Sequence, residues 1–114
     1  MKLFFTLFFL ASSILASPLQ DAIDSSSPYS TIKLSNNTYF GSIIINKPLT
    51  ILGLSDKVII DGEGSGTVVT INSSDVVLKN LSIINSGGRM DELDSAIAMN
   101  NVENCEIDSC AILD

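Results

Sequence analysis

The stretch Asp75-Val76-Val77-Leu78-Lys79-Asn80-Leu81-Ser82-Ile83-Ile84-Asn85 decides the fold, because its pattern occurs again elsewhere in the chain. Shifted forward by 29 positions it matches residues 104–114, and shifted back by 27 it matches residues 49–54. In these alignments, apolar residues align with apolar residues or cysteines, and polar residues align with polar ones. A second apolar ladder precedes the first on each pass: Ile43 and Ile45, Val69 and Ile71, Ile97 and Met99. The sequence therefore contains an internal repeat.

A repeat of 27 to 29 residues built from short alternating strands is typical of a solenoid. Each repeat has room for about three strands, and no single repeat can bury its own apolar face. Alternation points one side chain inward and the next outward. We therefore predict an all-β chain, a right-handed parallel β-helix, with Gly53, Asn80 and Ser109 at the corner of successive coils. A β-sandwich with coincidental spacing is the alternative.

The N-terminal residues have the composition of a secretory signal peptide. Lys2 is followed by an apolar run, residues 3–10, and then by a segment rich in small residues. The run is too short for a stable membrane span. We predict a signal peptide over residues 1–16, cleaved after Ala16. The mature domain then covers residues 17–114, and the loss of Lys2 changes its net charge from −7 to −8.

The predicted stack has two different ends. Leu19, Ala22 and Ile23 have i, i+3, i+4 spacing, which predicts a short helix that covers the open first coil. The sequence stops at Asp114 within a coil, so we expect a truncated piece, the N-terminal coils of a longer β-helix. Strands are predicted at residues 31–34, 42–46, 49–54, 58–60 and 67–71, with a turn at 35–41 and a glycine-rich loop at 61–66.

Charge and residue types argue against several functions. With 13 acidic and 6 basic residues and no basic patch, nucleic acid is not an expected partner. The sequence has no histidine, so it holds neither a His-based triad nor a His-ligated metal. Cys105 and Cys110 are expected as small buried core residues, and a disulfide between them is the alternative. We predict no catalytic, cofactor-binding or metal-binding set.

Residues 86–95 are the one long departure from the repeat, and such insertions usually form outward loops. Acids gathered on one loop most often make a solvated or partner-binding surface, which is our prediction. A bound cation such as calcium, or catalysis by paired carboxylates, are the alternatives. The candidate partner-binding residues are Arg89, Met90, Asp91, Glu92 and Asp94.

Several segments resemble the N-terminal region of the NosD family, periplasmic β-helix proteins of nitrous-oxide reductase maturation. The most specific is the loop that begins with Ser86-Gly87 and continues through Leu93-Asp94-Ser95-Ala96-Ile97. The resemblance covers nearly all of the mature chain, and family members are much longer. The other similar segments are residues 19–23, 38–41, 45–53, 58–62 and 78–81.

The resemblance implies a periplasmic, non-enzymatic accessory protein of denitrification. Its role would be to assist the assembly of the copper–sulfur centre in nitrous-oxide reductase. The implied partners are the subunits of an ABC transporter, an outer copper chaperone, and the reductase itself. Contact with the membrane would occur only through the transporter. Copper is handled by this pathway, and these residues carry no copper ligand set of their own.

The rival interpretation is a carbohydrate-active enzyme of pectin lyase-like fold, either a pectinesterase or a polysaccharide lyase. Pectinesterases have a Gln just before a strand similar to Ala96-Ile97-Ala98, and Ser95 stands there in this chain. A third interpretation is a non-catalytic β-helix that binds sugar or protein. The fold alone does not separate these three functions.

Overall fold

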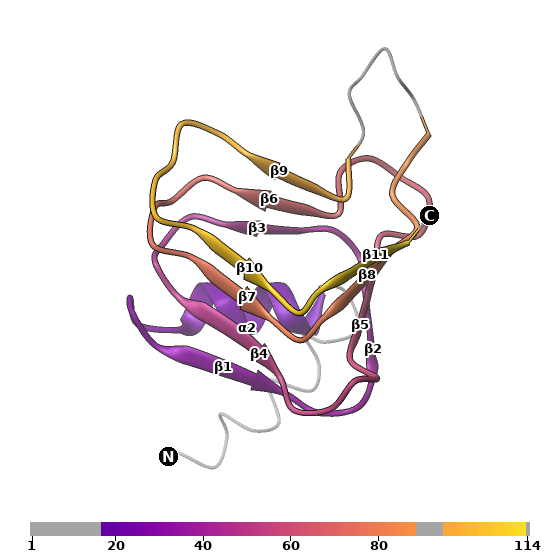
Figure 1. Cartoon of the computed structure of the whole chain (residues 1–114), viewed down its shortest axis with the longest axis horizontal. Coiled ribbons are helices and arrows are strands. Elements are labelled where there is room, and N and C mark those ends of the chain that lie inside the picture. Colours follow the sequence, from indigo (N-terminus) through magenta and orange to yellow (C-terminus); the bar gives the residue numbers. More distant parts are fainter. Residues whose placement is uncertain (1–16, 89–94, 114) are drawn as a thin grey trace, which may run out of the picture.

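The computed structural model describes residues 17–88 and 95–113, so the predicted signal peptide lies outside the described residues. Its short strands form three parallel sheets (Figure 1). Sheet A contains β1 (Thr31–Leu34), β4 (Thr50–Gly53), β7 (Val77–Lys79) and β10 (Glu106–Asp108). Sheet B contains β2 (Thr38–Phe40), β5 (Ile59–Asp61), β8 (Ser82–Ile84) and β11 (Ala111–Leu113). Sheet C contains β3 (Ile43–Ile45), β6 (Val69–Ile71) and β9 (Ile97–Met99).

The chain visits sheets A, B and C in turn, so each strand pairs in parallel with the strand three positions further along. The register confirms both predicted ladders. On sheet A, Leu78 lies between Ile51 and Ile107. On sheet C, Val69 lies between Ile43 and Ile97. The mostly β, parallel architecture therefore follows the sequence repeat.

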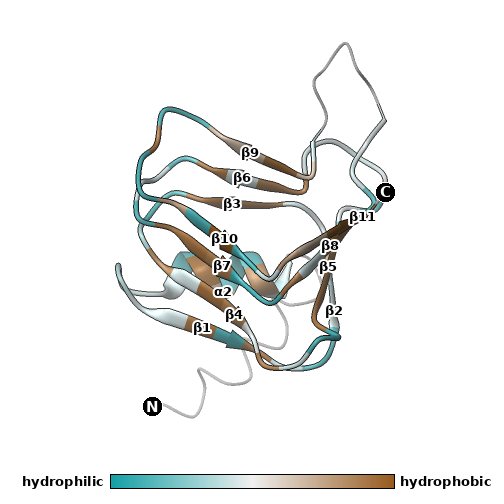
Figure 2. Cartoon of the chain, viewed as in Figure 1, coloured by the Kyte–Doolittle hydropathy of each residue, from teal (hydrophilic) through white to brown (hydrophobic). Residues whose placement is uncertain are grey.

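Buried and more exposed positions alternate along the strands, for example in β3 and β5. Figure 2 shows hydrophobic segments, in brown, along strands of all three sheets. The fully or nearly fully buried apolar residues form one core cluster that all three sheets contribute to. No strand supplies more than two of them and several supply none, so the core depends on stacking. The members are Leu19, Ile23, Leu34, Ile43, Ile45, Leu49, Ile51, Val58, Ile60, Val68, Val69, Ile71, Val76, Leu78, Leu81 and Ile83.

The predicted N-terminal helix is confirmed as α2 (Pro18–Ser25), which packs against β3. The Ser17 side chain caps it by accepting from the backbone N–H of Gln20, and the Leu19 and Ile23 side chains are 1% exposed. The Gln20 side-chain amide binds the Ile44 backbone as a neighbouring strand would. Its Oε1 accepts from the N–H of Ile44 at 2.8 Å, and its Nε2 donates to the Ile44 carbonyl at 3.0 Å. The helix therefore satisfies backbone groups at the outer edge of sheet C.

The prediction of a turn over residues 35–41 is wrong for its second half. Thr38–Phe40 form β2, and Tyr39 pairs with Ile60 of β5. Threonine and aromatic residues fit the pleated surface of a strand, and β5 supplies the hydrogen-bonding partner that the local sequence does not reveal. The predicted glycine-rich loop over 61–66 is confirmed after β5, with positive φ angles at Glu63, Gly64 and Gly66.

A ladder of asparagines follows the strands of sheet C. The Asn72 Nδ2 donates to the Asn46 Oδ1 at 3.4 Å, and the Asn100 Nδ2 donates to the Asn72 Oδ1 at 2.7 Å. Each residue directly follows its strand, so the three amides occupy the same corner in successive passes. Stacked amide ladders of this kind add hydrogen bonds between repeats and help to fix their register.

Candidate functional site

The predicted partner-binding residues Arg89, Met90, Asp91, Glu92 and Asp94 lie outside the described residues. The structure does describe both ends of their loop, residues 85–88 and 95–96, between β8 and β9. These two ends form what we call the loop stem. The stem lies over the glycine-rich loop that joins β5 to β6, because both connections link sheet B to sheet C.

Hydrogen bonds attach the loop stem to the connection below it. At the first end, the Gly64 N–H donates to the Asn85 carbonyl at 2.8 Å and the Gly87 N–H donates to the Gly66 carbonyl at 2.9 Å. At the second end, the Val68 N–H donates to the Ser95 carbonyl at 3.0 Å and the Ser95 N–H donates to the Thr67 Oγ1 at 3.2 Å. The chain between Gly88 and Ser95 therefore starts and ends on a fixed backbone.

The corner between sheets A and B is the second candidate site, and it confirms the predicted corner positions. Asn80 and Ser109 have φ angles of 58° and 55°, and at each of them the chain turns from a strand of sheet A to a strand of sheet B. Gly53 occupies the same position one pass earlier, and an added Cβ there would overlap the Asn80 carbonyl. Only glycine allows the next pass to stack this closely.

The Asn80 amide joins two passes at this corner. Its Nδ2 donates to the carbonyls of Gly53 and Ser55 at 3.0 and 3.2 Å. The side chain is half-buried, and its amide nitrogen is occupied by these two acceptors. Asn80 therefore holds the start of the β4–β5 connection against the pass above it.

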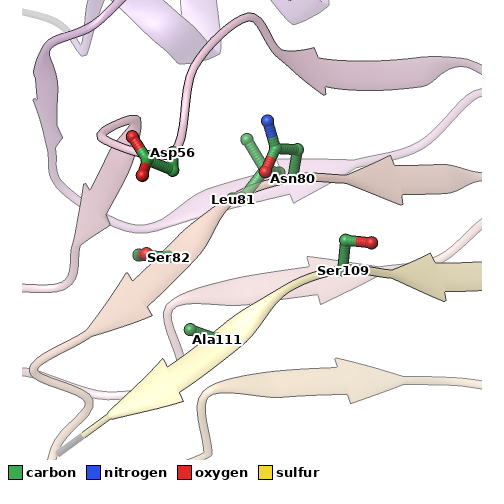
Figure 3. Close-up of a pocket in the computed structure, with 6 residues that line it drawn as sticks. All are labelled: Asp56, Asn80, Leu81, Ser82, Ser109 and Ala111. Carbon is green, nitrogen blue, oxygen red and sulfur yellow. The ribbon is translucent and has the colours of Figure 1, made fainter.

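A groove of about 140 Å³ lies on the outside of this corner (Figure 3). The wall carries the exposed Asp56 carboxylate, and the floor contains the buried Leu81 and the half-buried Ser82. The Ser109 hydroxyl, also in the lining, donates to the Asp108 carboxylate at 3.0 Å. The complete lining is Asp56, Asn80, Leu81, Ser82, Ser109 and Ala111. The corner residues follow from the sequence repeat, whereas the groove does not.

Both cysteines are free thiols that pack partly buried against the core. The Cys105 Sγ lies 3.5 Å from the Ser73 carbonyl, and the Cys110 Sγ lies 3.6 Å from the Leu78 carbonyl. They belong to different columns, since Cys105 precedes β10 and Cys110 follows it. The two thiols are unpaired, as expected, but the prediction of buried core residues holds only in part, because both side chains are partly buried at the edge of the core.

Within 17–88 and 95–113, no three His, Cys, Asp or Glu side chains gather closely enough to hold a metal ion. Among the described residues, no helix has the length and apolar character needed to cross a membrane.

No family model, no curated protein and no solved structure matches this chain.

Proposed function

We propose that the chain forms the first coils of a right-handed parallel β-helix. The support is the parallel pairing of each strand with the strand three positions further along. A crossover between parallel strands of one sheet is right-handed in about 98% of cases, which favours that hand here. By the resemblance to the NosD family, these coils would belong to the N-terminal part of a longer protein.

We further propose that this β-helix is a non-catalytic accessory protein of nitrous-oxide reductase maturation in the periplasm. Its working element is the loop 86–95, which docks on the reductase or on the ABC transporter that serves it. The observation that carries this proposal is the loop stem, whose hydrogen bonds to Asn85, Gly87 and Ser95 fix both ends of the loop. A loop on a rigid scaffold presents its side chains to a partner at a lower cost in conformational entropy.

Loop replacement tests this function. Residues 89–94 are exchanged for a Gly/Ser segment of the same length. The fold should persist, because the stem bonds come from residues outside the exchanged segment. Nitrous-oxide reduction by whole cells and pull-down of the reductase or transporter should both fall. The control is Asn36→Ser with Asn37→Ser, a change of exposed residues at the turn between β1 and β2.

Two results would contradict the proposal. Normal nitrous-oxide reduction and normal pull-down after loop replacement would remove the loop from the mechanism. Cleavage of pectin or alginate by the unaltered protein, lost on the same replacement, would support the carbohydrate-active enzyme instead.

A further inference from the structure

The middle residue of β3, Ile44, directs its backbone groups to the outer edge of sheet C. Ile43, one residue earlier, faces the other way, and its N–H donates to the Val68 carbonyl of the next pass at 2.8 Å. The Gln20 side chain of α2 occupies both backbone groups of Ile44, as an acceptor at 2.8 Å and as a donor at 3.0 Å. Without Gln20, Ile44 would present one donor and one acceptor on a strand edge.

The composition of β3 favours pairing with an identical strand. Residues 40–46 have no charge and no proline, and three consecutive isoleucines form the strand itself. Short segments of this kind pair readily with copies of themselves. Because Ile44 supplies a donor and an acceptor at one residue, two copies related by a two-fold axis can exchange both hydrogen bonds there. A second copy of the chain is therefore the partner that fits this edge.

Polar contacts hold α2 over this edge at both ends of the helix. Gln20 acts in the first turn, and at the other end the Lys47 Nζ donates to the carbonyls of Asp24 and Ser26 at 3.1 and 2.8 Å. The helix has only eight residues, of which two apolar side chains are buried. A helix of this length is not stable alone in water. The position of α2 therefore depends on Gln20 and Lys47 as well as on its apolar contacts.

We propose that α2 is a gate that prevents the chain from associating with itself through sheet C. While the gate is closed, the Gln20 amide blocks the backbone of Ile44. When it opens, β3 pairs in antiparallel with β3 of a second copy, and Ile44 lies on the two-fold axis. The outward Ile44 side chains, each 47% exposed in the closed chain, then lie beside each other. This gate is independent of the docking loop and of the proposed function.

The double variant Gln20→Glu with Lys47→Ala tests the gate with little change to the helix itself. A glutamate at this position still suits the Ser17 cap, but its carboxylate has no N–H to donate to the Ile44 carbonyl. Hydrogen exchange of the Ile44 amide reports whether the gate is open, and light scattering reports the mass. We expect faster exchange and a rise in mass to two chains. Ser25→Ala, whose hydroxyl bonds only within α2, should change neither.

A third substitution identifies the edge that pairs. Ile44→Lys, added to the double variant, places like charges directly opposite each other across the two-fold axis and should restore the mass of the unaltered protein. Leu113→Lys adds the same charge at an exposed residue of β11, in the last pass of the stack. It should leave the association of the double variant unchanged.

Four results would overturn the inference. Slow exchange of the Ile44 amide in the double variant would show that Gln20 and Lys47 do not hold α2. Fast exchange without a rise in mass would show that the freed edge does not pair. Reversal of the association by Leu113→Lys as well as by Ile44→Lys would place the contact elsewhere. Loss of the strand signal in circular dichroism would show that α2 is part of the core and not a gate.

Discussion

Replacement of Leu78 by alanine should unfold the stack at a much lower urea concentration. Leu78 is 0% exposed and lies in register between Ile51 and Ile107. The change removes three carbon groups at about 0.8 kcal/mol each, roughly 2.4 kcal/mol in all. Ile51 is fully buried and cannot move into the space, so a residual cavity raises the loss to about 3 kcal/mol.

The assay is urea unfolding followed by far-ultraviolet circular dichroism, since the chain has no tryptophan to report fluorescence. With a slope of about 2 kcal/mol per molar urea, Leu78→Ala should lower the midpoint by about 1.5 M. Lys79→Ala, at the outward neighbour on the same strand, should change stability by only about 0.5 kcal/mol. Equal shifts for the two variants would refute the inward orientation of Leu78, and with it the register of sheet A.

Two other predictions follow from the corner and from the N-terminus. Gly53→Ala should lower the free energy of unfolding by about 1 to 3 kcal/mol, because the new Cβ overlaps the Asn80 carbonyl. Gly88→Ala places its Cβ in open space and should change the unfolding midpoint little. Similar midpoints for the two variants would show that the passes stack less closely. N-terminal sequencing of protein from the periplasmic fraction should begin at Ser17, the residue that caps α2; an intact Met1 there would contradict the signal peptide.

The inward ladders could be predicted because burial on a strand has a period of two residues. Leu78, Ile51 and Ile107 share one phase of that alternation, and any register that mismatches them exposes apolar surface. The helix α2 was predictable for a similar reason, since Leu19 and Ile23 repeat with helical spacing. An element with one buried face therefore has its register fixed by the positions of its apolar residues.

Features that depend on contacts between passes were harder to predict. Thr38–Phe40 become a strand only because β5 lies beside them, and the asparagine ladder is visible only once the register is known. Even so, Asn46, Asn72 and Asn100 each directly follow a strand of sheet C, and this recurrence was available in the sequence. The groove depends on the unequal lengths of successive corners, which become meaningful only after the strands have been bounded.

The most direct test of the proposed docking loop is photo-crosslinking in cells that carry out nitrous-oxide reduction. A photoreactive amino acid is introduced in turn at Gly88 in the loop stem and at Lys33 on the outward face of β1, both of which are exposed. Crosslinks to the reductase or its transporter are predicted from Gly88 but not from Lys33. Equal crosslinks from both positions, or crosslinks from Lys33 alone, would contradict docking through the loop.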